Sequence, residues 1–180
     1  MEYFDIVDEN GIPTGETVER EKAHESGIRH RTAHVWIVRR VKGRTQILLQ
    51  KRCKSKDSFP GCYDISSAGH IPAGADYIAS ALRELKEELG VSVKEEELKD
   101  CGMHRMDVNT EFYGKPFIDR QVSKVFLLHL DWEAEDFKVQ EEEIESVIWM
   151  DFEECMQAVI HQSIPNCIDI KELEMLKAFL

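Results

Sequence analysis

Several features that mark other classes of protein are absent from this sequence. It has five cysteines, an odd number, widely spaced and without a Cys-x-x-Cys pair, so neither a disulfide framework nor a structural zinc site is expected. No stretch approaches the roughly 20 apolar residues that a membrane-spanning helix needs. The opening residues, Met-Glu-Tyr-Phe-Asp, have neither the basic start nor the apolar run of a secretory signal. These absences favour a cytoplasmic protein that does not enter the membrane.

An excess of positive charge is also absent. The chain has 23 Lys and Arg residues against 35 Asp and Glu residues, a net charge of −12. Such a balance disfavours nonspecific binding to nucleic acid or to an anionic membrane, because both repel a polyanion. It does not exclude a small phosphorylated ligand, since binding of that kind depends on local charge. The expected partner is a small phosphorylated substrate, and a monomer and a homodimer both remain open.

Repeats, low-complexity tracts and Pro/Gly/Ser-rich linkers are missing as well. A chain of 180 residues with 42% apolar residues is long enough to bury one core. We therefore expect a single domain over residues 1–180. Within it, residues 1–30 are predicted to form a hairpin that turns at Asn10-Gly11, with a short helix packed on it.

Hydrophobic spacing and turn residues predict strands and helices that do not alternate strictly. Strands are expected at Tyr3–Val7, Ala33–Val41, Gln46–Arg52, Cys62–Ser67, Lys99–Val108, Phe117–Leu130 and Ser146–Met150. Helices are expected at Glu19–Glu25, Asp76–Leu89, Phe152–Ile160 and Ile170–Leu180. This order favours an α+β fold in which helices cover a mixed β-sheet.

The helix expected at Asp76–Leu89 also gathers acidic residues. At about 100° per residue, Glu84, Glu87 and Glu88 fall within an arc of roughly 100° beside the apolar stripe. Three acids crowded near a helix C-terminus repel one another unless a cation lies among them. A solvated face of a Glu/Lys-rich helix is the alternative. Clustered carboxylate oxygens suit Mg²⁺ or Mn²⁺, and a magnesium site on an acidic protein indicates a phosphate substrate.

The segment Gly69–Val91 resembles the Nudix box, Gly-x5-Glu-x7-Arg-Glu-U-x-Glu-Glu-x-Gly-U, in which U is bulky and aliphatic. The matching positions are Gly69, Arg83, Glu84, Leu85, Glu87, Glu88, Gly90 and Val91. On this resemblance the chain is identified as a member of the Nudix hydrolase family. Membership implies an α/β/α sandwich with a mixed sheet between helices, and Mg²⁺ or Mn²⁺ as the cofactor.

The resemblance also assigns roles to residues. It implies that Glu84, Glu87 and Glu88 bind the metal ion, with help from the backbone carbonyl near Ala68. The supporting residues are Arg83, Gly69 and His70.

One position departs from the box, because its first Glu falls on Ala75. In the family that Glu pairs with the box arginine, so the partner of Arg83 is left open. The neighbouring Asp76 could take its place or could cap the helix, and capping is the favoured interpretation.

A second resemblance lies outside the box, to the Nudix branch that includes isopentenyl-diphosphate isomerase. The segments that carry it are His24, His30-Arg31, Leu48-Leu49-Gln50-Lys51-Arg52, Lys56, Pro60-Gly61 and Ala68-Gly69-His70. It implies that Arg52 and Lys56 grip a diphosphate, with ordinary surface charge as the alternative. It also suggests a second metal site at His24, His30, His70 and Asp119, although for His24 a structural role is favoured.

The acid/base pair of the isomerase is nevertheless missing. Its cysteine position holds Ala68 and its glutamate position holds Gln121. Neither side chain exchanges a proton near neutral pH. The sequence therefore predicts a Mg²⁺-dependent hydrolase that cleaves a phosphoanhydride bond in a nucleoside diphosphate-type or other diphosphate compound. An isomerase with unfamiliar acid/base groups and a binding protein with the same fold are the alternatives.

Two parts of this prediction remain open at the sequence level. The general base is expected to be Glu87 or an acid of Glu141–Glu145, although a solvated loop is the favoured interpretation of the latter run. Substrate specificity is expected in a loop at Val108–Pro116. There Phe112 and Tyr113 would either stack on a base or pack in the core.

Overall fold

The computed structural model describes all 180 residues and contains two β-sheets and four α-helices. The strands are β1 (Tyr3–Val7), β2 (Pro13–Glu19), β3 (His30–Val41), β4 (Arg44–Arg52), β5 (Tyr63–Asp64), β6 (Ser67–His70), β7 (Lys99–Phe112), β8 (Lys115–His129) and β9 (Ile144–Asp151). The helices are α1 (Arg20–Ser26), α2 (Tyr77–Leu89), α3 (Phe152–Ile160) and α4 (Ile170–Leu176). None of the helices combines the length and hydrophobicity needed to cross a membrane.

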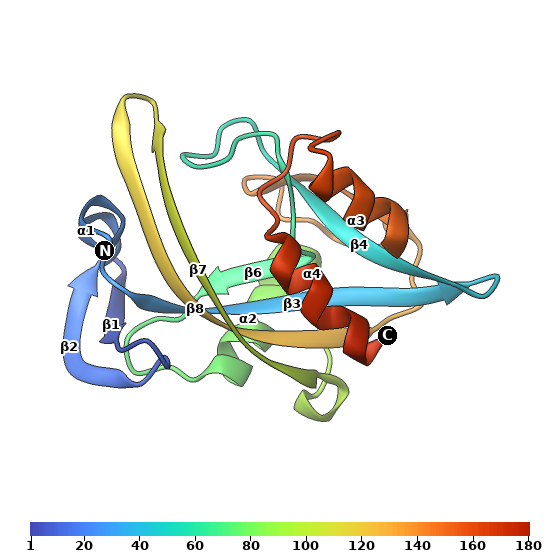
Figure 1. The fold of residues 1–180 in the computed structure, drawn as a ribbon. Helices are drawn as coiled ribbons and strands as arrows, with labels where there is room; N and C mark the ends of the chain where they lie inside the picture. The colour runs from blue at the N-terminus through green and yellow to red at the C-terminus, as the bar shows by residue number, and fades with distance from the viewer.

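The larger sheet is mixed, as the sequence predicts. Its main order is β5-β4-β3-β8-β7, with β6 paired to β3 and β9 paired to β4. Strands β3 and β8 are parallel, while the other pairs in this sheet are antiparallel. The smaller sheet consists of β1 and β2, which precede α1. Figure 1 shows β1, β2 and α1, which we call the N-terminal unit, beside the β7–β8 hairpin. This hairpin extends past the rest of the sheet.

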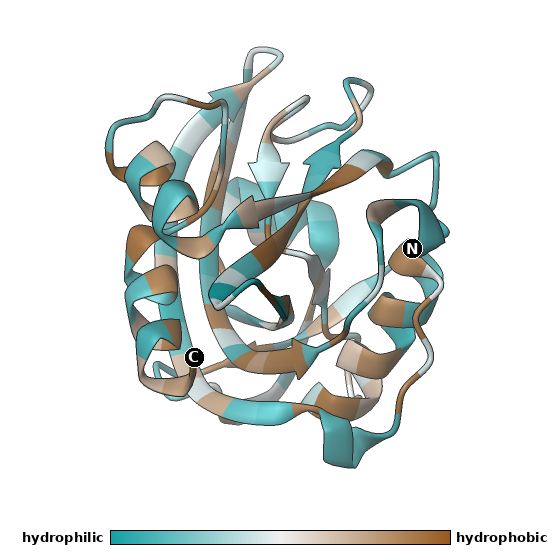
Figure 2. Ribbon diagram, turned by 90° about the vertical axis from the view of Figure 1, so that its right-hand side faces the viewer, coloured by the Kyte–Doolittle hydropathy of each residue, from teal (hydrophilic) through white to brown (hydrophobic).

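Helices cover both faces of the large sheet. Alternate residues of β3 point to opposite faces, so Ala33 and Val35 pack in the core under α2, and Trp36 and Val38 pack in the core under α3 and α4. Figure 1 shows α3 and α4 together on one side of the sheet. Figure 2 shows hydrophobic and hydrophilic residues alternating along the elements, as expected where each has one buried and one exposed face. The predicted α+β architecture is confirmed.

The prediction of a single strand at Cys62–Ser67 is wrong, because the chain leaves β5 and enters β6 within this range. Strand β5 pairs with β4, whereas β6 pairs with the first half of β3. Between them the Ser66 hydroxyl donates to the Leu48 carbonyl oxygen and accepts from the Ile37 amide. Because β4 pairs only with the second half of β3, β4 and β6 diverge, and the sheet forks at this point.

The loop conformation expected at Val108–Pro116 is also wrong, whereas the role of this segment in specificity stays a prediction. This segment continues β7 and β8 as a long hairpin whose turn is only Tyr113-Gly114. Both turn residues have positive φ, 53° and 76°, as a two-residue type I′ turn requires. A smaller difference lies at the C-terminus, where the last helix ends at Leu176 and continues as a 3₁₀ turn, Lys177–Phe179.

Candidate active site

A polar cavity of about 340 Å³ lies at the fork of the sheet. Its walls come from α2, β3, β4, β6 and β8, and from the loop between β4 and β5. The three box acids Glu84, Glu87 and Glu88 lie at one end, and residues before and within α4 lie at the other. The cavity thus joins the predicted metal ligands to residues far away in the sequence.

Helix α2 fixes the acids because both of its ends are capped. The Asp76 carboxylate accepts from the Ala79 amide at 2.9 Å, and Gly90 adopts the left-handed conformation that ends the helix. Asp76 is therefore an N-cap, as favoured from the sequence. The box arginine, Arg83, pairs instead with Glu84 at 2.6 Å and Glu87 at 3.1 Å.

Glu88 is the most enclosed of the three acids. One carboxylate oxygen accepts from the Ser67 hydroxyl at 2.7 Å and from the Ala68 amide at 3.3 Å. Burial nevertheless raises the pKa of Glu88 to about 8, and it also raises the pKa of Glu84. Glu87 is 52% exposed in its side chain. Burial therefore disfavours the charged forms of Glu84 and Glu88.

Gly69 makes room for this arrangement. A Cβ atom at this position would overlap the side chain of Glu84, so only glycine lets β6 lie this close to α2. The donor set consists of crowded, partly desolvated carboxylate oxygens, which fits Mg²⁺ or Mn²⁺. The backbone of Ala68 lies beside Glu88, and the role predicted for its carbonyl stays a prediction.

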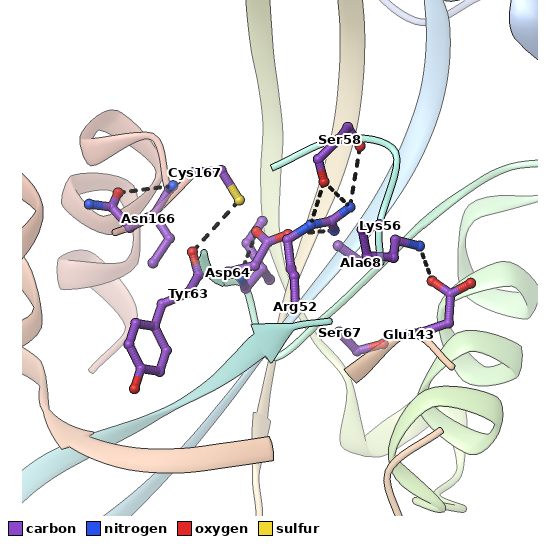
Figure 3. A network of polar contacts seen from close by, with 12 residues as sticks. Arg52, Lys56, Ser58, Tyr63, Asp64, Ser67, Ala68, Glu143, Asn166 and Cys167 are labelled. Atoms are coloured by element: carbon purple, nitrogen blue, oxygen red, sulfur yellow. Dashed lines mark hydrogen bonds and ion pairs between the residues drawn. The ribbon is translucent and has the colours of Figure 1, made fainter. Parts of the chain in front are cut away.

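The two basic residues expected to grip a diphosphate both line the cavity. Arg52 donates to the Ser58 carbonyl oxygen and pairs with Asp64 at 3.1 Å, and Lys56 pairs with Glu143 (Figure 3). Their side chains are only 17% and 15% exposed. Neither residue therefore contributes ordinary surface charge.

Glu143 is the one acid of Glu141–Glu145 that lines the cavity. Its carbonyl oxygen accepts from the Cys53 amide, while Glu145 pairs with Lys51 outside the cavity. The solvated-loop interpretation therefore holds for part of the run but not for Glu143.

Three histidines form a buried cluster beside the cavity. Ring nitrogens of His24, His30 and His70 lie within 4.8 Å of one another. An Asp119 oxygen lies 3.4 Å from Nε2 of His30 and 3.8 Å from Nε2 of His24. This oxygen and all three Nε2 atoms are buried without a hydrogen-bond partner.

Backbone carbonyl groups fix the orientation of two of these rings. Nδ1 of His24 lies 2.9 Å from the Arg20 carbonyl oxygen, and Nδ1 of His30 lies 2.9 Å from that of Ile28. A carbonyl only accepts, so each Nδ1 carries a proton and each ring turns its Nε2 into the cluster. Burial lowers the pKa of His30 to about 4, and it lowers that of His70 well below its usual value. His24 thus makes the expected structural hydrogen bond and also faces the cluster.

The aromatic residues of the expected specificity loop lie outside the cavity lining. Phe112 packs edge-on against Phe59 and Phe117, which agrees with the packing interpretation. Tyr113 is 73% exposed, and its hydroxyl donates to the Lys56 carbonyl oxygen. The hairpin tip therefore contacts the loop that carries Lys56.

Sequence reasoning missed several residues of the cavity. Two of them are the buried residues His34 and Glu172, whose side chains meet although they are 138 positions apart. The polar alternation His30-x-Thr32-x-His34, which precedes the apolar run Val35–Val38, was the available signal. Glu172 gave no signal, because a glutamate on a short helix is ordinary.

Comparisons with known proteins agree with this geometry. A family model described as the NUDIX domain matches residues 28–168. Nudix hydrolase 3 of Arabidopsis thaliana is 39% identical over 155 residues, which make up 85% of this chain but 20% of the plant protein. An uncharacterized Nudix hydrolase of Clostridium acetobutylicum is 35% identical over 153 residues, or 85% of this chain and 71% of that protein.

Solved structures share the fold at lower identity. A Deinococcus radiodurans protein superposes with a TM-score of 0.68 at 20% identity, covering 96% of both chains. A C. elegans Ap4A hydrolase superposes with a TM-score of 0.55 at 22% identity, covering 83% of this chain and 96% of that one. At these identities the likeness concerns the fold alone.

Proposed function

The chain belongs to the Nudix hydrolase family of pyrophosphohydrolases, and we propose that it cleaves a phosphoanhydride bond in a small diphosphate compound in the presence of Mg²⁺ or Mn²⁺. The observation that carries the proposal is the placement of three box acids and two basic residues around one cavity. A nucleoside diphosphate joined to another group is the proposed substrate class. The resemblance to the isomerase branch stays a prediction.

Glu84, Glu87 and Glu88 would hold the cation at one end of the cavity. When bound there, the ion lowers the pKa of a coordinated water and neutralises phosphate oxygens. Arg83 pairs with two of these acids and so keeps their side chains close together before the ion arrives. This interaction replaces the one that the family's first box Glu makes and that Ala75 cannot make.

Arg52 and Lys56 would bind the phosphate oxygens and stabilise the leaving group. In the structure both are neutralised by acids, Asp64 and Glu143. A phosphate that draws Lys56 away frees the Glu143 carboxylate inside the cavity. Glu143 could then accept a proton from the attacking water, whose oxygen bonds to phosphorus as the bridging P–O bond breaks. Glu87 remains the alternative base.

A screen of diphosphate compounds with Mg²⁺ tests the proposal. Nucleotide sugars, dinucleotides, nucleoside di- and triphosphates and isoprenoid diphosphates are incubated with the protein, and the products are identified. We expect hydrolysis of at least one compound, and we expect Glu88→Gln and Glu87→Gln each to lower turnover by orders of magnitude in a folded protein. Hydrolysis by both variants at the wild-type rate would show that these box acids take no part in the mechanism.

The two alternatives give different results in the same screen. An isomerase converts isopentenyl diphosphate into a product without releasing phosphate. A binding protein retains a ligand but yields no product.

The histidine cluster supports a second proposal, a further cation site formed by His24, His30, His70 and Asp119. Its support is the set of four buried, unpartnered atoms that face one another. Imidazole ligands suit Zn²⁺, and the carboxylate also suits Mn²⁺.

A further inference from the structure

The sheet face under α4 changes from apolar to polar along its length. On β3, Trp36 packs in the core with α4, but Thr32 and His34 lie on the same face. On β8, Ser123 lies opposite Thr32, and Gln121, two residues earlier in the chain, lies on the same face. All these polar side chains are at least nine-tenths buried. We call Thr32, His34 and Gln121, which line the cavity, the polar floor.

His34 is held rigidly in this floor. Its Nδ1 lies 3.0 Å from both carboxylate oxygens of Glu172, and Trp36 donates to the same carboxylate at 2.7 Å. Because a carboxylate accepts, Nδ1 of His34 carries a proton. Burial opposes charge on both partners, yet their attraction raises the pKa of His34 and lowers that of Glu172. With Nδ1–H held by Glu172, Nε2 of His34 faces Thr32 on the cavity side.

The groups that His34 meets on the cavity side are weakly bound. Nε2 of His34 lies 3.2 Å from the Thr32 hydroxyl, and that hydroxyl lies 3.5 Å from the side-chain amide oxygen of Gln121. The shorter bond of Thr32 goes to Ser123 at 2.7 Å. Rearranging the two long contacts costs little, so Nε2 of His34, the Thr32 hydroxyl and the side-chain oxygen of Gln121 can turn towards a ligand, while Nε2 of Gln121 still donates to Asp119.

The rest of the cavity does not suit an apolar ligand either. Only seven of its 28 lining residues are hydrophobic, and Gln50 and Asp64 also line it. An apolar chain pressed against this floor would separate its polar groups from water without replacing their hydrogen bonds. A group that carries hydroxyls can replace them.

We propose that the polar floor binds the organic group attached to the diphosphate, and that this group is hydroxylated, as a ribose or another sugar is. Nε2 of His34 forms a hydrogen bond with a ligand hydroxyl, while Thr32 and Gln121 exchange hydrogen bonds with neighbouring hydroxyls. Glu172 is a positioning residue that fixes the ring of His34. The inference rests on the proposed function only for the diphosphate end of the ligand.

Calorimetric titration with Ca²⁺ in place of Mg²⁺ tests the proposal by binding rather than turnover. The probes are ADP-ribose, UDP-glucose, isopentenyl diphosphate and inorganic diphosphate. We expect one of the two sugar-bearing probes to bind roughly tenfold or more tightly than isopentenyl diphosphate. We expect His34→Asn to weaken the binding of that probe by roughly tenfold and to leave the affinity for inorganic diphosphate unchanged. Thr32→Val should act in the same direction.

Trp36→Phe is the matched control, because Trp36 donates to the same carboxylate of Glu172 but does not line the cavity. Because Trp36 also helps to hold Glu172, this variant should weaken binding of the sugar-bearing probe less than His34→Asn does, and it should leave the affinity for inorganic diphosphate unchanged. Sugar-bearing probes that bind no more tightly than isopentenyl diphosphate would overturn the proposal, as would equal losses in Trp36→Phe and His34→Asn. Absence of Mg²⁺-dependent hydrolysis would overturn the proposed function alone, since these titrations need no turnover.

Discussion

Burial of Glu88 sets the charge balance of the box acids. Its carboxyl group keeps two donors, Ser67 and the Ala68 amide, but burial still raises its pKa from 4.5 to about 8. Between these two values the folded protein holds a proton that the unfolded chain has released. Stability without divalent cations therefore falls as the pH rises across this window, by at most about 1.4 kcal/mol per pH unit.

Glu88→Gln should remove this pH dependence, because an amide does not titrate. We expect the variant, measured in chelator, to lose less stability than the wild type between pH 5 and pH 8, and to be the more stable protein above pH 8. Denaturant unfolding at a series of pH values measures this. Glu87→Gln is the control, since that side chain is half exposed and should keep the wild-type slope. Parallel profiles for all three proteins would contradict the burial argument.

Single residues also show where sequence reasoning stops. The acids Glu84, Glu87 and Glu88 are recognisable because they lie close together on one helix. His34 and Glu172 are not, because their contact across 138 positions exists only once α4 lies on the sheet. Patterns within one element are visible in a sequence, whereas partners supplied by the tertiary fold are not.

At the scale of elements, α2 is predictable and β5–β6 is not. Helix α2 combines an apolar stripe, an N-cap at Asp76 and a C-terminal glycine, so every local signal agrees. The break between β5 and β6 depends on Ser66, whose hydroxyl bridges β3 and β4. The turn at Tyr113-Gly114 was missed because tyrosine is unusual at a position with positive φ.

The contact between β6 and α2 yields a prediction of its own. Gly69→Ala places a methyl group against Glu84, so that side chain must move away from β6. We expect Mg²⁺ affinity to fall by roughly tenfold or more, since ligand geometry is disturbed. Calorimetric titration with Mg²⁺ measures this. Gly74→Ala is a control for backbone strain outside the box helix, because a Cβ there meets nothing within 4 Å although the φ of 78° is strained for alanine. Unchanged affinity in Gly69→Ala would show that the close approach is unimportant for the metal.

At the scale of the whole molecule, the histidine cluster brings together residues from four different elements. His24 comes from α1, His30 from β3, His70 from β6 and Asp119 from β8. A cation bound by all four would link the N-terminal unit to the large sheet. Because such a cation binds only the folded state, it would stabilise the entire fold by an amount that grows with the logarithm of its concentration relative to its Kd.

Titration with Mn²⁺ should therefore reveal two binding events in the wild-type protein. Glu88→Gln should lose the event at the box, and His30→Gln should lose the event at the cluster together with most of the rise in unfolding temperature that Mn²⁺ produces there. His104→Gln is the matched control, because His104 is also a buried histidine but has its own partner, Asp169, at 3.0 Å. Full stoichiometry in His30→Gln would show that the unpartnered ring nitrogens bind no cation, and the cluster would then have to be a neutral packing feature of the N-terminal unit.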